Sequence, residues 1–278
     1  MIIDGRAIAE KLVLDLKKDI QQAKCKITLS IVLVGSDPSS EIYVSNKIKR
    51  ATSVGIETRL IHFNEEVSER LLLDAIENEN VDDEVHGIIV QMPLPKHINQ
   101  LTVIEKISFK KDVDGFNPYS KGYLTIGSNK GFVPCTPRGC LHLIQEVEPD
   151  ISGMEAVVIG RSNIVGKPMS YILTNKNVTV TVTHSKTRNL SDITKRADII
   201  VSAVGNPMFL DRSYFNKNAI VIDVGIKRLH NGKLAGDVHF LDVKDHVRAI
   251  TPVPGGVGPM TIAYLLKNTF ESYKNSIA

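Results

Sequence analysis

The chain has 278 residues, of which 42% are hydrophobic and 23% charged, a mixture typical of globular proteins and unlike that of disordered or fibrous chains. At roughly 150 residues per domain, this length favours two domains over one. The 34 basic and 31 acidic residues leave a formal charge of +3. This excess is too small and too scattered to predict a surface for nucleic acid.

Neither a targeting segment nor a disulfide framework is indicated. The opening residues MIIDGR lack the basic and apolar regions of a secretory signal, and no apolar run approaches the roughly 18 residues of a membrane helix. Cys25, Cys135 and Cys140 are odd in number and never spaced C-x-x-C, and no histidines follow H-x-x-x-H spacing. We therefore expect a cytoplasmic protein without a bound metal, a membrane segment or a nucleic-acid partner.

Helix and strand patterns alternate in the first half. Apolar residues recur every fourth position from Ile8 to Ile20 and predict a helix over about residues 6–24. Asp37 and Pro38 are typical of a helix start, and we expect this second helix to end before Gly55. The other elements expected here are strands at 28–34, 56–63 and 87–92 and a helix near 68–80. This alternation predicts a mostly parallel sheet covered by helices.

Between Ser108 and Pro137 the periodic pattern lapses, and we expect a loop-rich crossing between domains with a short hairpin around 124–132. A second α/β set follows, so the fold class is α/β with two domains. Its expected strands are 156–159, 178–183, 198–203 and 219–224, and its expected helices are 166–175, 191–196 and 259–276.

A glycine-rich turn, GRSNIVG from Gly160 to Gly166, is the sharpest local signal. A glycine directly after a buried strand lets the backbone approach a phosphate, and the next helix offers free N–H groups and its positive dipole end. The spacing is G-x-S-x-x-x-G rather than G-x-G-x-x-G, so an ordinary strand-to-helix turn is the alternative.

The residues after the next strand bear on the choice of nucleotide. NAD sites usually place an acid there, about 20 residues beyond the glycines, to bind the ribose hydroxyls. Here the strand at 178–183 runs into HSKTR, which has no acid. Hydroxyls and cations, with Arg161 from the first turn, suit a 2′-phosphate and predict NADP. Lys186 and Arg188 as merely solvated charges are the alternative.

Polar residues in the first half are candidates for chemistry. Tyr43, Lys47 and Arg50 share one face of the helix expected at 38–54, so a ring and an amine can face one ligand. A lysine there can equally be a solvated charge. Gln91 lies near the carboxyl end of a strand, where ligands gather in open α/β sheets, although a satisfied core amide is the alternative.

Two loops carry further candidates. Asp112 and Asp114 lie in the crossing segment, where paired carboxylates are often turn formers. A calcium loop is not predicted, because the later ligands are missing. The segment PVPGGVGPMT, residues 252–261, sets three glycines among three prolines and forms either a hinge between domains or a wall facing a ligand.

Seven segments in order carry a family resemblance. They are YVSNK (43–47), VHGIIVQMPLP (85–95), KDVDGF (111–116), PCTPRG (134–139), GRSNIVG (160–166), DVGI (223–226) and PGGVGP (254–259). Over essentially its whole length the chain resembles the bifunctional methylenetetrahydrofolate dehydrogenase/methenyltetrahydrofolate cyclohydrolase family. One departure is Gly122-Tyr123, where the family commonly has a glycine followed by a cation.

The resemblance implies an N-terminal α/β catalytic domain over 1–138, joined by the last helix, 260–278, and a Rossmann-like NADP-binding domain over 139–259. It implies an active site in the cleft between the domains, a homodimer formed through the nucleotide domains, and tetrahydrofolate derivatives as substrates. The enzyme is then a cytoplasmic one of one-carbon metabolism that serves purine biosynthesis. A dehydrogenase without the cyclohydrolase, another two-domain NADP dehydrogenase, and a non-enzymatic regulator are the alternatives.

The resemblance also implies roles for residues. Tyr43 would stack on the pterin–aminobenzoyl part of folate, and Lys47 would be the essential amine, positioned and polarised by Gln91. Asp114 would accept hydrogen bonds from the guanidine-like edge of the pterin. The other substrate contacts would be Val90, Met92, Pro254, Gly255, Gly256, Val257, Gly258 and Thr261. NADP would be held by Gly160, Arg161, Ser162, Ser185 and Ile226.

The chemistry agrees with those roles. Oxidation removes a hydride from the one-carbon bridge and mainly needs the nicotinamide placed against that carbon. Hydrolysis of the methenyl cation needs a base for water, and burial beside a cationic substrate favours the neutral amine that Lys47 would need.

Overall fold

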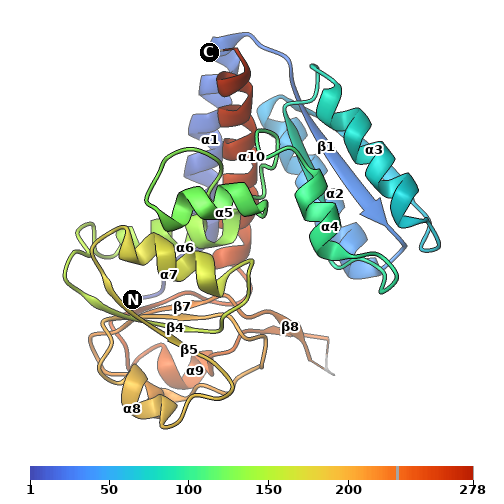
Figure 1. Cartoon of the computed structure of the whole chain (residues 1–278). Coiled ribbons are helices and arrows are strands. Elements are labelled where there is room, and N and C mark those ends of the chain that lie inside the picture. The colour runs from blue at the N-terminus through green and yellow to red at the C-terminus, as the bar shows by residue number, and fades with distance from the viewer. Residues whose placement is uncertain (230–231, 278) are drawn as a thin grey trace. The chain divides into compact units, whose positions relative to one another are not determined.

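The computed structural model describes residues 1–229 and 232–277. These residues form two compact units (Figure 1). The five-stranded unit comprises Met1–Glu10, Leu124–Ser128 and Thr136–Thr261, and the three-stranded unit comprises Lys11–Tyr123, Asn129–Cys135 and Ile262–Ala278. Two parallel sheets confirm the α/β fold class expected from the sequence.

The sheet of the three-stranded unit has the order β2-β1-β3 and is parallel throughout. The central strand β1 (Ile27–Val34) is buried at every position, as expected for a parallel strand that is covered on both faces. Its neighbours are β2 (Ile56–Phe63) and β3 (Gly87–Val90). The third strand is two residues shorter than predicted, so Gln91 and Met92 lie just beyond its carboxyl end.

Local signals define the helices of this unit. Asp37 precedes α2 (Pro38–Val54), and its carboxylate accepts a hydrogen bond from the Ser40 N–H at 2.8 Å. The helix ends at Gly55, whose φ of 92° lies in the left-handed region that favours glycine. The other helices with residues in this unit are α1 (Gly5–Ala23), α3 (Glu69–Val81), α4 (Gln100–Lys106), α5 (Pro118–Thr125) and α10 (Val257–Ser276).

The last helix, α10, is tied to the segment that crosses between the units. The Asn268 side-chain amide donates to the carbonyls of Val113 at 2.8 Å and Val133 at 3.2 Å. The Ser272 hydroxyl donates to the Lys110 carbonyl at 2.9 Å. The return of the final helix to the N-terminal part of the chain is therefore confirmed.

The crossing segment differs most from expectation. The predicted hairpin around 124–132 is wrong, because α5 continues to Thr125 and no strand follows it before Phe132. The Asn117 side-chain oxygen accepts the N–H of Tyr119 and begins that helix, a signal that the sequence carried. Cys135–Gln145 forms α6, which the pattern also missed. At the departure from the family, the ring of Tyr123 packs 6.4 Å from that of Phe109.

The sheet of the five-stranded unit has the order β10-β7-β6-β4-β5 and is parallel throughout. The strand order reverses between β4 and β6, which makes this position the switch point where ligands bind in open α/β sheets. The strands are β4 (Glu155–Ile159), β5 (Thr179–Thr183), β6 (Ile199–Ser202), β7 (Ile220–Asp223) and β10 (Ala249–Ile250).

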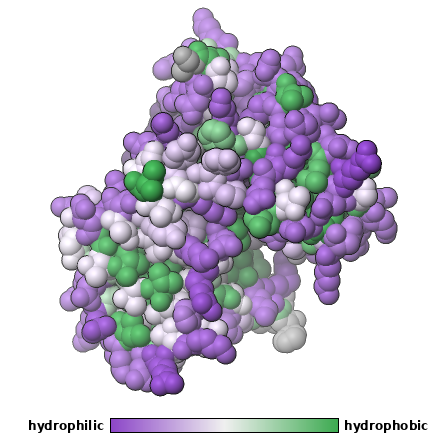
Figure 2. Space-filling model, in the orientation of Figure 1, coloured by the Kyte–Doolittle hydropathy of each residue, from purple (hydrophilic) through white to green (hydrophobic). Residues whose placement is uncertain are grey.

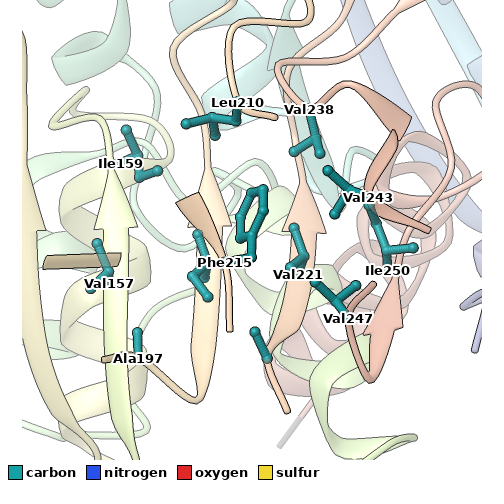
Figure 3. Close-up of a cluster of buried hydrophobic side chains, with 12 residues drawn as sticks. Val157, Ile159, Ala197, Leu210, Phe215, Val221, Val238, Val243, Val247 and Ile250 are labelled. Atoms are coloured by element: carbon teal, nitrogen blue, oxygen red, sulfur yellow. The ribbon is translucent and has the colours of Figure 1, made fainter. Parts of the chain in front are cut away.

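One face of this sheet forms a compact apolar core. The ring of Phe215 lies in the middle of the cluster, with Leu210 and Val221 close by (Figure 3). The helices that lie mainly in this unit are α6, α7 (Gly166–Thr174), α8 (Leu190–Thr194) and α9 (Phe240–Val243). A short hairpin comprises β8 (Lys227–Arg228) and β9 (Leu234–Ala235). The sequence patterns missed the hairpin, α4, α9 and β10, all of which are too short for periodicity to register.

Hydrophilic residues dominate the face seen in Figure 2, where apolar residues form small separate patches. None of the helices among the described residues combines the length and apolarity needed to cross a membrane.

Candidate active site and nucleotide site

Lys47 and Gln91 come together in the three-stranded unit although 44 positions separate them. The Lys47 Nζ donates to the Gln91 Oε1 at 3.0 Å. The Gln91 backbone N–H donates to Val32 of the central strand at 2.8 Å, and its side-chain Nε2 donates to the Met92 carbonyl at 2.7 Å. These bonds leave the amide oxygen directed at the amine, so the glutamine holds the lysine head group in place.

Tyr43 lies one turn before Lys47 on α2. Its side chain is exposed, whereas Lys47 and Arg50 are half-buried on the same helix. The shared face expected from the spacing is therefore present. A large exposed ring beside a half-buried amine offers a stacking surface and a polar contact to one ligand.

Asp114 lies in the loop that follows α4, and its carboxyl is near Lys47 and Cys135. Burial penalises the charged form and raises the pKa of Asp114, while the charge of Lys47 and a hydrogen bond with Cys135 act in the opposite direction. The structure thus brings Lys47, Gln91 and Asp114 into one polar cluster of the three-stranded unit.

Asp112, two residues earlier, has a different environment. It is 1% exposed, and its Oδ2 accepts the Asn117 N–H at 2.7 Å. Burial raises the pKa of Asp112 to about 7. Of the two candidate carboxylates, Asp112 is therefore the turn former, and Asp114 is the one whose pKa the charge of Lys47 acts to lower.

A cleft of about 540 Å³ opens at the carboxyl end of the three-stranded sheet. Its lining comes from the loops after the three strands: residues 34–37, 64–66 and 93–95. Asp37, Glu65 and Glu66 make it acidic, and none of Lys47, Gln91 and Asp114 lines it. The cleft agrees with the rule that ligands gather at this edge of a parallel sheet.

The glycine-rich segment before α10 belongs to the five-stranded unit through Thr261. Gly255 has a φ of 108°, and a Cβ on Gly256 would lie 2.6 Å from the Pro252 carbonyl oxygen, so backbone geometry explains both glycines. Gly258 is exposed, with open space where its Cβ would be. Thr261 shares a hydrogen bond of 3.0 Å with the Thr136 hydroxyl.

The turn after β4 has the close backbone approach expected for a phosphate site. Gly160 has a φ of 117°, and a Cβ there would lie 2.6 Å from the Ala203 carbonyl oxygen. A Cβ on Gly166 would overlap the Gly160 carbonyl. Only glycines fit at these two positions, and they bring the turn against the loop that follows β6.

The expectation about the helix after this turn needs correction. The Ser162 hydroxyl accepts the N–H groups of Val165 at 3.1 Å and Gly166 at 3.3 Å, and its carbonyl accepts that of Lys167. Three donors at the start of α7 are therefore satisfied within the chain. An anion here would be bound by the exposed Arg161 side chain and by the hydroxyl hydrogen of Ser162.

The residues after β5 form a tight turn. The His184 N–H donates to the Thr187 hydroxyl at 2.9 Å, and the Lys186 N–H to His184 Nδ1 at 3.2 Å. Ser185, Lys186 and Arg188 are exposed, and the turn contains no acid. Ile226, after β7, is also exposed at the carboxyl edge of the same sheet.

Asp223 and Asp237 are two buried carboxylates that the sequence motifs did not mark as functional. Asp223 ends a buried strand and precedes a glycine by two residues, a pattern that could have marked it. Asp237 follows a two-residue strand that has no recognisable pattern.

The five-stranded unit thus has the topology and the phosphate turn of a nucleotide-binding α/β domain, and the three-stranded unit holds a polar amine–amide–carboxylate cluster. A family model described as tetrahydrofolate dehydrogenase/cyclohydrolase, catalytic domain, matches residues 3–114. The NAD(P)-binding domain of the same family matches residues 134–277.

Individual relatives point to the same family. The bifunctional protein FolD of Rickettsia typhi is 51% identical, over 100% of this chain and 99% of its own length. The crystal structure of the bifunctional enzyme FolD from Campylobacter jejuni is 45% identical with a TM-score of 0.96, and covers 99% of each chain. That of the Trypanosoma brucei enzyme, complexed with NADP cofactor and inhibitor, is 34% identical with a TM-score of 0.93, over 100% of this chain and 98% of that one.

The chain belongs to the tetrahydrofolate dehydrogenase/cyclohydrolase family. It is a bifunctional enzyme with both activities of that family, and its second half binds NAD(P).

Proposed function

We propose that the enzyme uses NADP to oxidise 5,10-methylenetetrahydrofolate to the 5,10-methenyl form, and then hydrolyses that form to 10-formyltetrahydrofolate. The observation that carries this proposal is the Lys47 amine, held at 3.0 Å by the Gln91 amide near the Asp114 carboxyl. A dehydrogenase alone would not need such a base. The acid-free turn after β5 and the Trypanosoma brucei relative with bound NADP support the choice of cofactor.

The oxidation needs positioning more than acid or base. NADP supplies the hydride acceptor, and the chain supplies the surface that orients it. Gly160 lets the backbone approach the phosphates, while Arg161, Ser162 and Ser185 offer donors to phosphate oxygens. Ile226 offers an exposed apolar contact at the same sheet edge.

The hydrolysis needs a proton acceptor. Water attacks the methenyl carbon and passes one proton to the Lys47 amine. One carbon–nitrogen bond of the ring then breaks as the new hydroxyl becomes the formyl carbonyl, the released nitrogen takes the hydroxyl proton, and Lys47 returns its own proton to solvent. Gln91 accepts one N–H of the amine and so fixes the direction of its lone pair. General-base help of this kind contributes about 10²–10⁴-fold to the rate.

The remaining proposals concern folate binding. Tyr43 stacks on the aromatic portion of the substrate, and Asp114 accepts two hydrogen bonds from the guanidine-like edge of the pterin. A carboxylate whose charge is disfavoured by burial gains strongly from such a donor pair. The further substrate contacts that we propose are Val90, Met92, Pro254, Gly255, Gly256, Val257, Gly258 and Thr261.

We assign the folate-binding domain to residues 1–138 with helix 260–278, and the NADP-binding domain to residues 139–259. We also propose a cytoplasmic homodimer in one-carbon metabolism that supplies purine biosynthesis. The edge strand β5, which exposes Thr179, Thr181 and Val182, supports pairing with a second copy. Sedimentation equilibrium tests the assembly, and the mass of a monomer would refute it.

The decisive experiment supplies 5,10-methylenetetrahydrofolate with either NADP or NAD, and follows the reduced cofactor and the methenyl absorbance together. We expect reduction of NADP and only transient methenyl absorbance. Stoichiometric accumulation of the methenyl form in a medium where it is otherwise stable would indicate a dehydrogenase alone, and equal rates with NAD would overturn the cofactor choice.

A further inference from the structure

Two buried acids, Asp223 and Asp237, lie at the carboxyl edge of the five-stranded sheet. Asp223 is 3% exposed and Asp237 is fully buried. Within residues 1–229 and 232–277, neither carboxylate takes part in an ion pair, and six hydrogen bonds from neutral groups satisfy the two. Burying a charge in this way is costly, so the arrangement calls for an explanation beyond packing.

Asp237 binds the loop that follows β6. Its Oδ2 accepts the Ser202 hydroxyl at 2.8 Å and the Val204 N–H at 2.9 Å, and its Oδ1 accepts the Asn206 N–H at 2.8 Å. One carboxylate therefore fixes three positions of a five-residue stretch that leaves the sheet at the switch point.

Asp223 in turn holds Asp237 and the loop after β7. Its Oδ1 accepts the N–H groups of Gly225 at 3.1 Å and Asp237 at 2.9 Å, and its Oδ2 accepts that of Val238 at 2.9 Å. A Cβ on Gly225 would overlap the Asp237 carboxylate, and one on Gly236 would overlap that of Asp223. The backbone is thus closed tightly around both acids.

The loops held in this way border the nucleotide turn. Gly160 of that turn packs against Ala203 and Val204, which lie in the loop bound by Asp237. Ile226 directly follows Gly225, which is bound by Asp223. We propose that Asp223 and Asp237 are positioning residues for the NADP site, which together hold the loops after β6 and β7 in the conformation that binds the nucleotide.

This inference rests on the assignment of that sheet edge to NADP in the proposed function. Carboxylates suit the task because they only accept hydrogen bonds, and all six surrounding groups donate. An asparagine at position 237 must point its amide N–H₂ either at the Asn206 N–H or at the Val204 N–H, and one bond is lost in each case. Burial, and secondarily the charge of Asp237, raises the pKa of Asp223 to about 7. The charged form of Asp223 therefore destabilises the fold, which agrees with a role other than stability.

The test compares NADP affinity, measured by titration calorimetry, in the full-length enzyme and in Asp237→Asn. We expect Kd to rise about tenfold or more, as for a lost buried hydrogen bond to a charged group. The cyclohydrolase rate on supplied methenyltetrahydrofolate, which needs no cofactor, should stay within about twofold. Asp198→Asn is the matched control, because Asp198 accepts the Glu155 N–H at 2.9 Å at the amino end of the same sheet, and it should leave Kd unchanged.

Ser202→Ala is a milder variant that keeps both acids and removes one donor to Asp237, and we expect Kd to rise about threefold. Unchanged affinity in Asp237→Asn would overturn the proposal, as would an equal loss of the cyclohydrolase, since that pattern indicates a general structural role. If Asp237→Asn does not fold, unchanged affinity in Ser202→Ala overturns it instead. Failure of the unmodified enzyme to bind NADP would overturn the cofactor assignment and this inference with it, before any variant is compared.

Discussion

Replacement of Asp112 by asparagine should make the enzyme more stable at high pH relative to the unmodified chain. Burial raises the pKa of Asp112 from 3.8 to about 7. Between pH 3.8 and about 7, Asp112 keeps its proton in the folded protein but loses it in the unfolded chain. The free energy of unfolding therefore falls as the pH rises through this range, and above about pH 7 the whole loss is present. The pKa rises by about 3, and each pKa unit corresponds to about 1.36 kcal/mol, so the loss of stability is about 4 kcal/mol.

Asparagine keeps an acceptor for the Asn117 N–H and never ionises, so it is free of this cost. The difference in unfolding free energy between Asp112→Asn and the unmodified enzyme should grow by about 3 kcal/mol, in favour of the variant, from pH 5 to pH 8. Urea denaturation followed by far-UV circular dichroism measures it, since the chain has 0 tryptophans. The exposed Asp19→Asn serves as the control. A difference for Asp112→Asn that does not change with pH would refute the reasoning.

Three further predictions concern activity. Lys47→Met should lower the cyclohydrolase rate by about 10²–10⁴-fold. Lys49→Met, which changes an exposed lysine of the same helix, is the control and should leave this rate unchanged. A full rate of hydrolysis in Lys47→Met would show that this lysine is not part of the mechanism. Asp114→Ala should mainly raise KM for the folate substrate in steady-state assays, and unchanged KM and kcat would contradict its role. Arg161→Ala combined with Ser185→Ala should weaken the preference for NADP over NAD by about tenfold or more, and a preserved ratio of kcat/KM values would count against both contacts.

Much of the fold could be predicted because its signals are local. The helix from Pro38 to Val54 begins and ends where Asp37 and Gly55 predict, since a cap acts on N–H groups within its own turn. The apolar run that forms β1 is buried at all positions, as the pattern indicates. The crossing segment was mispredicted for two reasons. The local signal at Asn117, which begins α5, was overlooked, and the backbone at Val113 and Val133 is held by the distant side chain of Asn268.

The candidate site, too, could be predicted from the sequence only in part. The ordered motifs were sufficient to indicate the family and to name Lys47, Gln91 and Asp114, because residue type and order are properties of the sequence. Without the family resemblance, residue type and spacing could not tell Asp112 from Asp114, which are close in sequence and differ in what surrounds them. Nor could they reveal that Ser162 already binds the first donors of α7.

The sequence by itself therefore determined the class of protein, most of its longer helices and strands, and the residues available for chemistry. The tertiary structure alone decided which of these residues meet: Lys47 with Gln91 at 3.0 Å, and Asp237 with Ser202 at 2.8 Å. Contacts of this kind join positions 44 and 35 residues apart. They depend on how strands are ordered in a sheet and where each ends, and a local pattern does not carry that information.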